Sequence, residues 1–292
     1  MPTSASAAYP LALYHRMTPR DRNLLALLDE HQVLTTGQVH RLHYTAIRTC
    51  QIRLRELYEI GLLGRFRFAR LYGGSEPWHW VLGLHGARFM AGAAGRPAPT
   101  ERAHRDQVIR LTARSRLPHL LATNEFFVRL ACTARIDARV RLDRWWSERT
   151  TTGKFMRIRP DGHGLWTAAG RTVGWFLETD LGSEPLTRVI GKLEAYERLA
   201  ASGGPAYPVL FWLPNAERES HLQQALRQRL PEVPVATATH ETDPAGAVWL
   251  PVDGWQRVSL PELPSDHGRN TAANPNWVGG QLDLSNQADL AA

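Results

Sequence analysis

Three acidic residues in the middle of the chain have the types and spacing of ligands for a divalent metal ion. Glu178 and Asp180 follow an apolar run at residues 173–177 that is typical of a buried strand. Alternate side chains of a strand point to the same face, so these two carboxylates should lie together. Asp161 ends the preceding predicted strand and would join them if the two strands pair across residues 162–172. Such hard oxygen ligands suit Mg²⁺ or Mn²⁺, which can activate water and stabilise phosphoryl charge.

A lysine follows these acids on a predicted helix. The chain has only two lysines, Lys154 and Lys192, among its 35 basic residues, so arginine is expected at an ordinary cationic surface position. Lys192 therefore indicates a need for a compact point charge beside the acids. A structural role also fits each residue, because Asp161 precedes a glycine, as in many turns. Glu178 and Asp180 can be solvated acids at a strand end, and Lys192 can be an ordinary surface residue.

Strands and helices alternate through the second half of the chain and would position these side chains. Predicted strands cover residues 140–147, 155–159, 173–177, 207–213 and 247–251, and predicted helices cover residues 117–135, 185–200 and 217–230. This alternation predicts an α/β sheet with helices on both sides. His119 and Asn124 lie in the first of these helices, and we expect both to have a satisfied role on the helix surface.

The first part of the chain has the element order of a winged helix. Thr18 and Pro19 are typical of a helix start, and further helices are predicted at residues 36–42 and 45–60. Two β-like runs follow at residues 63–71 and 78–82, with a turn sequence between them. Three helices and then a hairpin would allow the third helix to enter the major groove of DNA.

Polar side chains on the third helix and the hairpin are candidates for contact with DNA. Arg48, Gln51 and Arg55 share the helix face opposite the predicted apolar stripe, and such side chains reach base edges. Arg65 and Arg67 of the hairpin can contact phosphate. The pattern also fits an ordinary solvated arginine face, or a winged helix that docks a protein.

Basic charge is concentrated in the N-terminal part of the chain. Residues 1–116 hold 17 Arg and 8 Asp or Glu, a balance of +9. Residues 117–292 hold 18 Lys or Arg and 20 Asp or Glu, a balance of −2. This asymmetry favours a polyanion-binding module followed by a domain with a different role.

The remaining composition bears on location and cofactors. No apolar run approaches the roughly 20 residues needed to cross a bilayer. Residues 1–16 lack a basic n-region and a long apolar h-region, so we expect a flexible tail and not a secretion signal. Two cysteines are too few for a disulfide framework or a zinc cluster. A cytoplasmic location without a membrane partner is therefore expected.

The arrangement of Asp161 and Glu178-Thr-Asp180 resembles the PD-(D/E)xK nuclease core. That motif has lysine where this chain has Asp180, and Lys192 on the next helix would be a migrated substitute. The sequences RPDG and FLETDLGSEPLTRVIGKLEAY, with the N-terminal module, resemble the replication-relaxation family of actinobacterial plasmids and mobile elements. This resemblance covers roughly residues 17–230.

The resemblance implies an α/β protein, α+β overall, made of two domains. A winged helix-turn-helix domain would cover residues 17–95, and a linker or connecting helix residues 96–116. A restriction-endonuclease-like mixed-sheet domain would cover residues 117–264. Residues 265–292 are rich in Asn, Gly, Ser and Asp, and we expect them to form a disordered tail.

Two functions are compatible with these features. The first is a DNA-binding protein of plasmid replication or mobilisation that nicks or cleaves double-stranded DNA with Mg²⁺ or Mn²⁺. Asp161, Glu178 and Asp180 would hold the metal ion, while Lys192 would orient water or stabilise the phosphate. The alternative is a non-catalytic DNA-binding protein of replication or transfer, or a transcription regulator. Its nuclease-like domain would be an inactive scaffold that binds other plasmid replication or transfer proteins.

Overall fold

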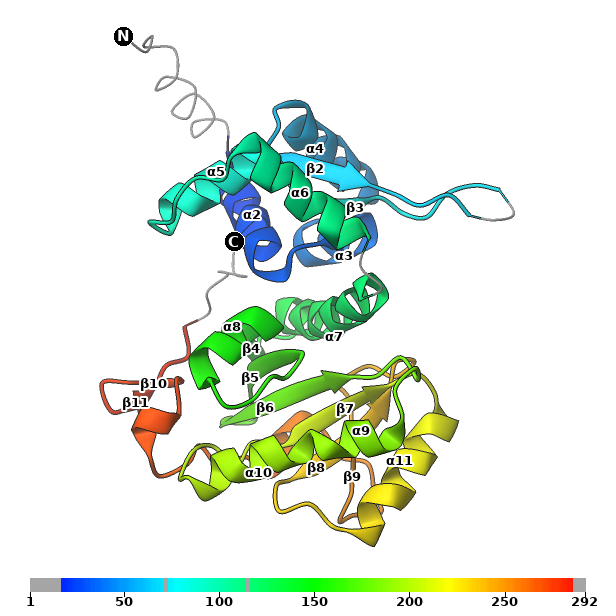
Figure 1. The fold of residues 1–292 in the computed structure, drawn as a ribbon, viewed down its shortest axis with the longest axis vertical. Helices are drawn as coiled ribbons and strands as arrows, with labels where there is room; N and C mark the ends of the chain where they lie inside the picture. The colour runs from blue at the N-terminus through cyan, green and yellow to red at the C-terminus, as the bar shows by residue number, and fades with distance from the viewer. Residues whose placement is uncertain (1–16, 71–72, 114–115, 286–292) are drawn as a thin grey trace. The chain divides into compact units, whose positions relative to one another are not determined.

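The computed structural model describes residues 17–70, 73–113 and 116–285 (Figure 1). These residues form two compact units, residues 17–117 and residues 118–285. Helices combined with a six-stranded mixed sheet confirm the predicted α/β class. The predicted flexible tail at residues 1–16 lies outside the described residues.

The first unit combines helices with a small antiparallel sheet. Its elements are α2 (Pro19–His31), β1 (Leu34–Thr35), α3 (Thr36–His43), α4 (Ile47–Glu59), β2 (Leu63–Phe66), β3 (His79–Leu82), α5 (Leu84–Ala93) and α6 (Glu101–Thr112). The strands pair in the order β1-β3-β2. The described residues between β2 and β3, 67–70 and 73–78, extend beyond the helices of this unit (Figure 1). β2 is shorter than the predicted run at residues 63–71, whose last residue lies outside the described ranges.

Local sequence explains where the first helices begin. The Thr18 hydroxyl accepts a hydrogen bond from the Asp21 amide, and the Asp21 carboxylate accepts one from the Thr18 amide. Thr35 and Gln38 form the same reciprocal pair at the start of α3. Such capping boxes satisfy amide donors that have no carbonyl partner in the first turn. The predicted helix start at Thr18 and Pro19 is confirmed.

A buried ion pair fixes α4 against α2. The Arg53 guanidinium on α4 donates to both carboxylate oxygens of Asp21 on α2, at 2.5 and 3.0 Å. Burial opposes ionisation of Asp21, but bonds from Arg53 and Thr18 hold the pKa of this carboxyl below its usual value. The same helices bury the predicted leucines of α2 and most of the predicted apolar stripe of α4, namely Leu24, Leu25, Leu27, Leu28, Cys50, Leu54 and Leu57. Ile47, predicted to face the core with them, is 44% exposed at the start of α4.

The second unit is built on one large sheet. Its elements are α7 (Leu117–Ile136), β4 (Val140–Ser147), α8 (Glu148–Phe155), β5 (Gly162–Ala168), β6 (Arg171–Thr179), α9 (Leu186–Gly191), α10 (Leu193–Ala201), β7 (Val209–Leu213), α11 (Ala216–Gln228), β8 (Val235–Thr239), β9 (Leu250–Pro251), the 3₁₀ helices η1 (Leu260–Glu262) and η2 (Thr271–Ala273), β10 (Trp277–Val278) and β11 (Gln281–Leu282). The strand order is β4-β5-β6-β7-β8-β9. β6, β7 and β8 are parallel, and the other neighbouring pairs are antiparallel.

Helices cover both faces of this sheet, as predicted (Figure 1). On one face, Phe126 of α7 contacts the rings of Trp175 in β6 and Trp212 in β7. On the other face, Phe176 and Phe211 from the same two strands belong to a buried cluster with side chains of α9, α10 and α11. Because side chains alternate along a strand, Glu178 and Asp180 share the second face with Phe176.

The structure corrects the predictions around Asp161. Residues 155–159 do not form a strand, because Phe155 ends α8 and Met156 adopts a left-handed backbone with φ of 60°. Residues 162–172 are not an irregular connection, because they belong to the hairpin formed by β5 and β6. Asp161 therefore precedes β5 and does not end an earlier strand.

The predicted disordered tail is ordered as far as Ser285. The Arg144 guanidinium is buried, with 1% of the side chain exposed. It donates to the Asn276 side chain at 2.6 Å and to the carbonyl oxygens of Asp283 and Ser285. The polar composition of this segment suggested disorder, but its polar groups satisfy a buried arginine.

Candidate functional site

The β5–β6 hairpin brings Asp161 next to the end of β6. Gly162 pairs with Leu177, so the preceding residue reaches the level of Glu178. The Asp161 amide donates to the Leu177 carbonyl at 2.9 Å, and its carboxylate accepts from the Thr179 amide at 2.7 Å. These bonds to the backbone of β6 hold the Asp161 carboxylate beside the C-terminal end of that strand.

Glu178 is the centre of the site. Only 3% of its side chain is exposed, and its carboxylate accepts hydrogen bonds from Lys192 Nζ, at 2.8 Å, and from the Tyr196 hydroxyl. Lys192 stands at the junction of α9 and α10, which divides the predicted continuous helix. Its Nζ also lies 3.7 Å from Glu184. We call Asp161, Glu178, Lys192, Tyr196 and His119, which is described below, the Glu178 cluster.

Burial and a neighbouring acid perturb the ionisation of Glu178. Burial and the charge of Asp161 raise its pKa to about 7, although the ammonium of Lys192 acts in the opposite direction. Burial favours the neutral amine of Lys192, but Glu178, Asp161 and Glu184 together raise the pKa of Lys192. The cluster therefore holds a cationic lysine beside two acids that repel each other.

His119 belongs to the cluster, although its position in the sequence predicts a satisfied role on the helix surface. Its Nε2 lies 2.7 Å from the Thr179 carbonyl oxygen and 3.1 Å from an Asp161 carboxylate oxygen. Burial opposes protonation, but the Asp161 carboxylate raises the pKa of His119. Thr123, one turn further along α7, contacts the same strand end, because its hydroxyl donates to that of Thr179.

Asp180 is not brought into the cluster. Its carboxylate accepts from Arg218 Nε on α11 and from the Gly182 amide, each at 2.7 Å. Arg218 also donates to the Glu184 carbonyl oxygen. The predicted site residues thus separate into two groups, with Asp161, Glu178 and Lys192 together and Asp180 paired with Arg218.

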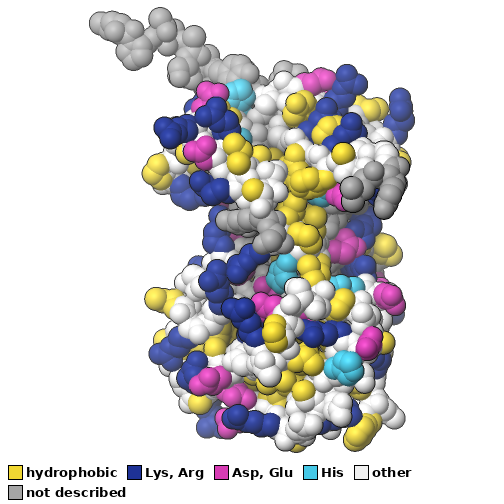
Figure 2. Space-filling view, turned by 45° about the vertical axis from the view of Figure 1, so that its right-hand side comes forward, with side chains coloured by type: hydrophobic (Ala, Val, Ile, Leu, Met, Phe, Trp, Pro, Cys, Tyr) yellow, Lys and Arg dark blue, Asp and Glu magenta, His cyan; other side chains and the backbone are white. Residues whose placement is uncertain are grey.

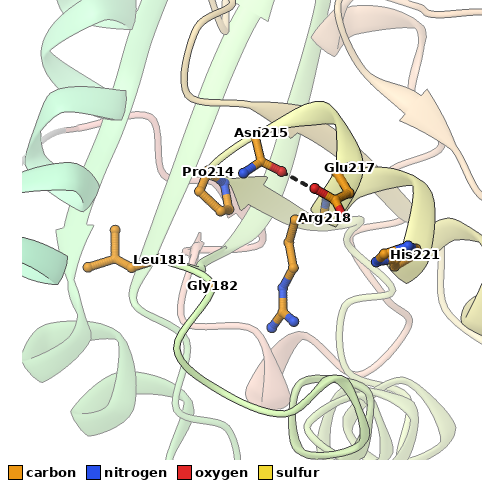
Figure 3. Close-up of a pocket in the computed structure, with 7 residues that line it drawn as sticks. All are labelled: Leu181, Gly182, Pro214, Asn215, Glu217, Arg218 and His221. Atoms are coloured by element: carbon orange, nitrogen blue, oxygen red, sulfur yellow. Dashed lines mark hydrogen bonds between the residues drawn. The ribbon is translucent and has the colours of Figure 1, made fainter.

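A cavity of about 330 Å³ lies beside the Asp180–Arg218 pair, at the start of α11 (Figure 3). Its lining consists of Leu181, Gly182, Pro214, Asn215, Glu217, Arg218 and His221. Asn215 caps α11 by accepting a hydrogen bond from the Arg218 amide. The Arg218 side chain extends from this helix end towards the loop that follows Gly182 (Figure 3).

The carboxylates of the Glu178 cluster fit a metal ion that needs few protein ligands. In the part of the chain that the structure describes, no group of three or more His, Cys, Asp or Glu side chains is arranged to hold a metal ion. Mg²⁺ keeps several waters and is commonly held by one or two carboxylates together with substrate phosphates. Asp161 and Glu178 supply two carboxylates, but a metal ion would have to displace one of the bonds that Lys192 and Tyr196 make to Glu178. Both carboxylate oxygens of Asp180 are engaged by Arg218 and Gly182.

A family model described as replication-relaxation matches residues 25–209. The chain belongs to the replication-relaxation family. The match runs from α2 to the start of β7 and includes all residues of the Glu178 cluster. No curated protein and no solved structure matches the chain.

The predicted DNA-contact residues of this replication-relaxation protein lie on α4 and on the β2–β3 hairpin. Arg48, Gln51 and Arg55 are exposed on α4, where Arg55 pairs with Glu59 at 2.9 Å. On the hairpin, the guanidinium groups of Arg65 and Arg67 stack on the same tryptophan, Trp78, at 4.2 and 4.4 Å from its ring centre. Arg65 also lies over Tyr58 of α4. Aromatic stacking therefore orders both arginines.

The visible surface of the replication-relaxation protein carries many basic side chains. Figure 2 shows Lys and Arg side chains over the visible face of both units, with hydrophobic side chains among them. Within the described ranges, no helix has the length and apolarity to cross a membrane.

Proposed function

We propose that this protein binds double-stranded DNA through a winged helix in its first unit. We further propose that its second unit carries a metal-dependent site that cleaves or nicks the DNA backbone. Both activities would serve the replication or transfer of a plasmid or mobile element. One observation carries the catalytic proposal: Lys192 Nζ lies 2.8 Å from Glu178, beside the acid Asp161.

The element order of the first unit supports DNA binding. Helix, strand, two helices and a hairpin is the order of a winged helix, in which the helix before the hairpin can enter the major groove. Exposed Arg48, Gln51 and Arg55 on α4 have the chemistry to contact base edges. Stacked Arg65 and Arg67 are suited to phosphate, because their side chains are already ordered before contact.

The chemistry of the second unit follows from its own side chains. Asp161 and Glu178 would hold Mg²⁺ or Mn²⁺, and the ion when bound would supply positive charge to a phosphoryl group attacked by water. Lys192 has 36% of its side chain exposed, so its ammonium can turn from Glu178 towards a phosphate oxygen. His119 donates towards the Asp161 carboxylate and so would hold it in place. Arg218 neutralises Asp180, so this acid does not compete with Glu178 for Lys192.

An inactive scaffold is the second candidate, and the closed bonding of the cluster favours it. Both oxygens of Glu178 accept hydrogen bonds, one from Lys192 and one from Tyr196. A site of this kind is stable without a metal ion. The protein would then bind DNA and use the second unit to bind other replication or transfer proteins.

Incubation of supercoiled plasmid with Mg²⁺ or Mn²⁺ tests the catalytic proposal. We expect nicked or linear product from the wild type, and strong loss of product from Asp161→Asn and Lys192→Met. Glu194→Gln on α10 is the matched control, because this exposed acid pairs with the nearby Arg198 in a surface contact. Equal DNA binding by all proteins with no cleavage by the wild type would instead support the scaffold.

The salt dependence of binding tests the DNA interface. Arg48→Ala should weaken specific binding by about 1–3 kcal/mol, as for loss of a base contact, and Arg67→Ala should lower the salt slope by about 1. Arg102→Ala on α6 is the control, because this arginine is 86% exposed and outside the proposed face. If Arg48→Ala and Arg67→Ala bind as the control does, the interface is wrongly assigned.

A further inference from the structure

The most exposed stripe of α4 has a branched aliphatic side chain at its centre. Ile52 is 51% exposed. It lies four residues after Arg48 and three before Arg55, so the three side chains are neighbours on the helix surface. The opposite face of α4 is buried and consists of Cys50, Leu54 and Leu57.

The surroundings of Ile52 favour DNA over a protein partner. A protein-docking face would place further apolar side chains around it, whereas the residues three or four positions away on α4 are Arg48, Thr49, Arg55 and Glu56. The one acid among them, Glu56, is paired with Arg53. The N-terminal part of the chain also has a charge balance of +9, which complements a polyanion. The major groove of DNA presents one apolar group, the 5-methyl of thymine, among its polar base edges.

We propose that Ile52 contacts a thymine methyl in the recognised site and so determines part of the DNA sequence preference. This inference rests on the proposed DNA-binding function of α4. Arg48, Gln51 or Arg55 would contact neighbouring base pairs, because their side chains flank Ile52 on the same surface. The recognised site therefore contains an A·T pair whose thymine cannot be replaced by uracil without loss of affinity.

The expected effect is small but measurable. Burial of one methyl-sized group contributes about 0.8 kcal/mol. Since about 1.4 kcal/mol corresponds to a tenfold change in affinity, thymine-to-uracil replacement at the contacted position should weaken binding about fourfold. The replacement removes only the methyl group and leaves base pairing intact.

The full chain is first used to select the DNA duplexes that it binds from a pool of random sequence. The selected duplex is the probe. Uracil then replaces each thymine of the selected site in turn, and the affinity of each duplex is measured. We expect one position where the wild type loses about fourfold and Ile52→Ala loses nothing. Ile109→Ala is the matched control, because Ile109 is 55% exposed on α6, outside this face. It should keep the wild-type discrimination.

The outcomes separate this inference from the function on which it rests. Absence of duplex binding by the wild type overturns both proposals. Specific binding that is insensitive to uracil at every position overturns the role of Ile52 alone. If Ile52→Ala still binds the thymine duplex more tightly than the uracil duplex, the role of Ile52 is also overturned, because another side chain would then contact the methyl group.

Discussion

Glu178→Gln should change the pH dependence of the stability of the second unit. The carboxyl is buried, and burial together with Asp161 raises its pKa to about 7 from 4.5. Glutamine keeps the shape and one acceptor oxygen, which can keep the bond from Lys192, while its NH2 group can donate to the Tyr196 hydroxyl; it cannot ionise. Comparison of the two proteins therefore isolates the titration of this one group.

The direction and size of the effect follow from proton linkage. Below about pH 4.5 the carboxyl is protonated in both the folded and the unfolded chain, so ionisation costs no stability. As the pH rises towards 7, the unfolded chain releases its proton first, and the folded state loses stability relative to it. At about 1.4 kcal/mol per pKa unit, the shift to about 7 corresponds to about 3 kcal/mol.

Thermal melting of the wild type and Glu178→Gln between about pH 4 and about pH 8 measures this effect. The difference in stability should move in favour of the variant by about 3 kcal/mol, or about 6–12 °C in Tm for a unit of this size. Glu194→Gln is the control, because Glu194 is 72% exposed and should show no comparable trend. A difference between wild type and Glu178→Gln that is constant with pH would refute the reasoning. A shift in favour of the wild type would mean that the Lys192 ammonium outweighs burial and Asp161.

Two further predictions concern buried ions of the second unit. Arg218→Met leaves the Asp180 carboxylate, 6% exposed, without its cation and should cost about 3–5 kcal/mol in urea unfolding; a loss below about 1 kcal/mol would contradict the pairing. Removal of residues 265–292 leaves buried Arg144 without its acceptors and should lower the Tm, and Arg144→Met should recover part of this loss. Failure of the recovery would show that the segment stabilises the unit by other contacts.

Apolar patterning predicted much of the second unit but not the hairpin beside the site. β4 has the predicted bounds, and the fully buried β7 is the predicted interior strand. The β5 strand was missed because its glycines at positions 162 and 164 are typical of turns. Gly164 is required there by packing, because a Cβ at this position would lie 2.1 Å from the Trp175 ring. That ring comes from the neighbouring strand, so the local sequence carries no sign of it.

For the candidate site too, the local sequence predicted only part of the arrangement. Strand periodicity gave Glu178 and Asp180 a common face, which agrees with their contacts to helices on one side of the sheet. It did not give their partners, because Arg218 lies 38 residues from Asp180 along the chain. His119 lies 60 residues from Thr179, to which it is hydrogen bonded. Side chains so distant in sequence meet only through the sheet order.

The charge balance of the two groups supports a role for a divalent cation. Asp180 and Arg218 cancel each other, and the pair Glu178 and Lys192 does the same. Asp161 then remains as the acid whose main neighbours are a histidine and a backbone amide. A metal ion beside Asp161 would relieve its repulsion with Glu178, which together with the larger effect of burial raises the pKa of Glu178. Arg218 balances the charge of Asp180, the position at which the nuclease motif that the sequence resembles has lysine, and Lys192 is the cation of the cluster.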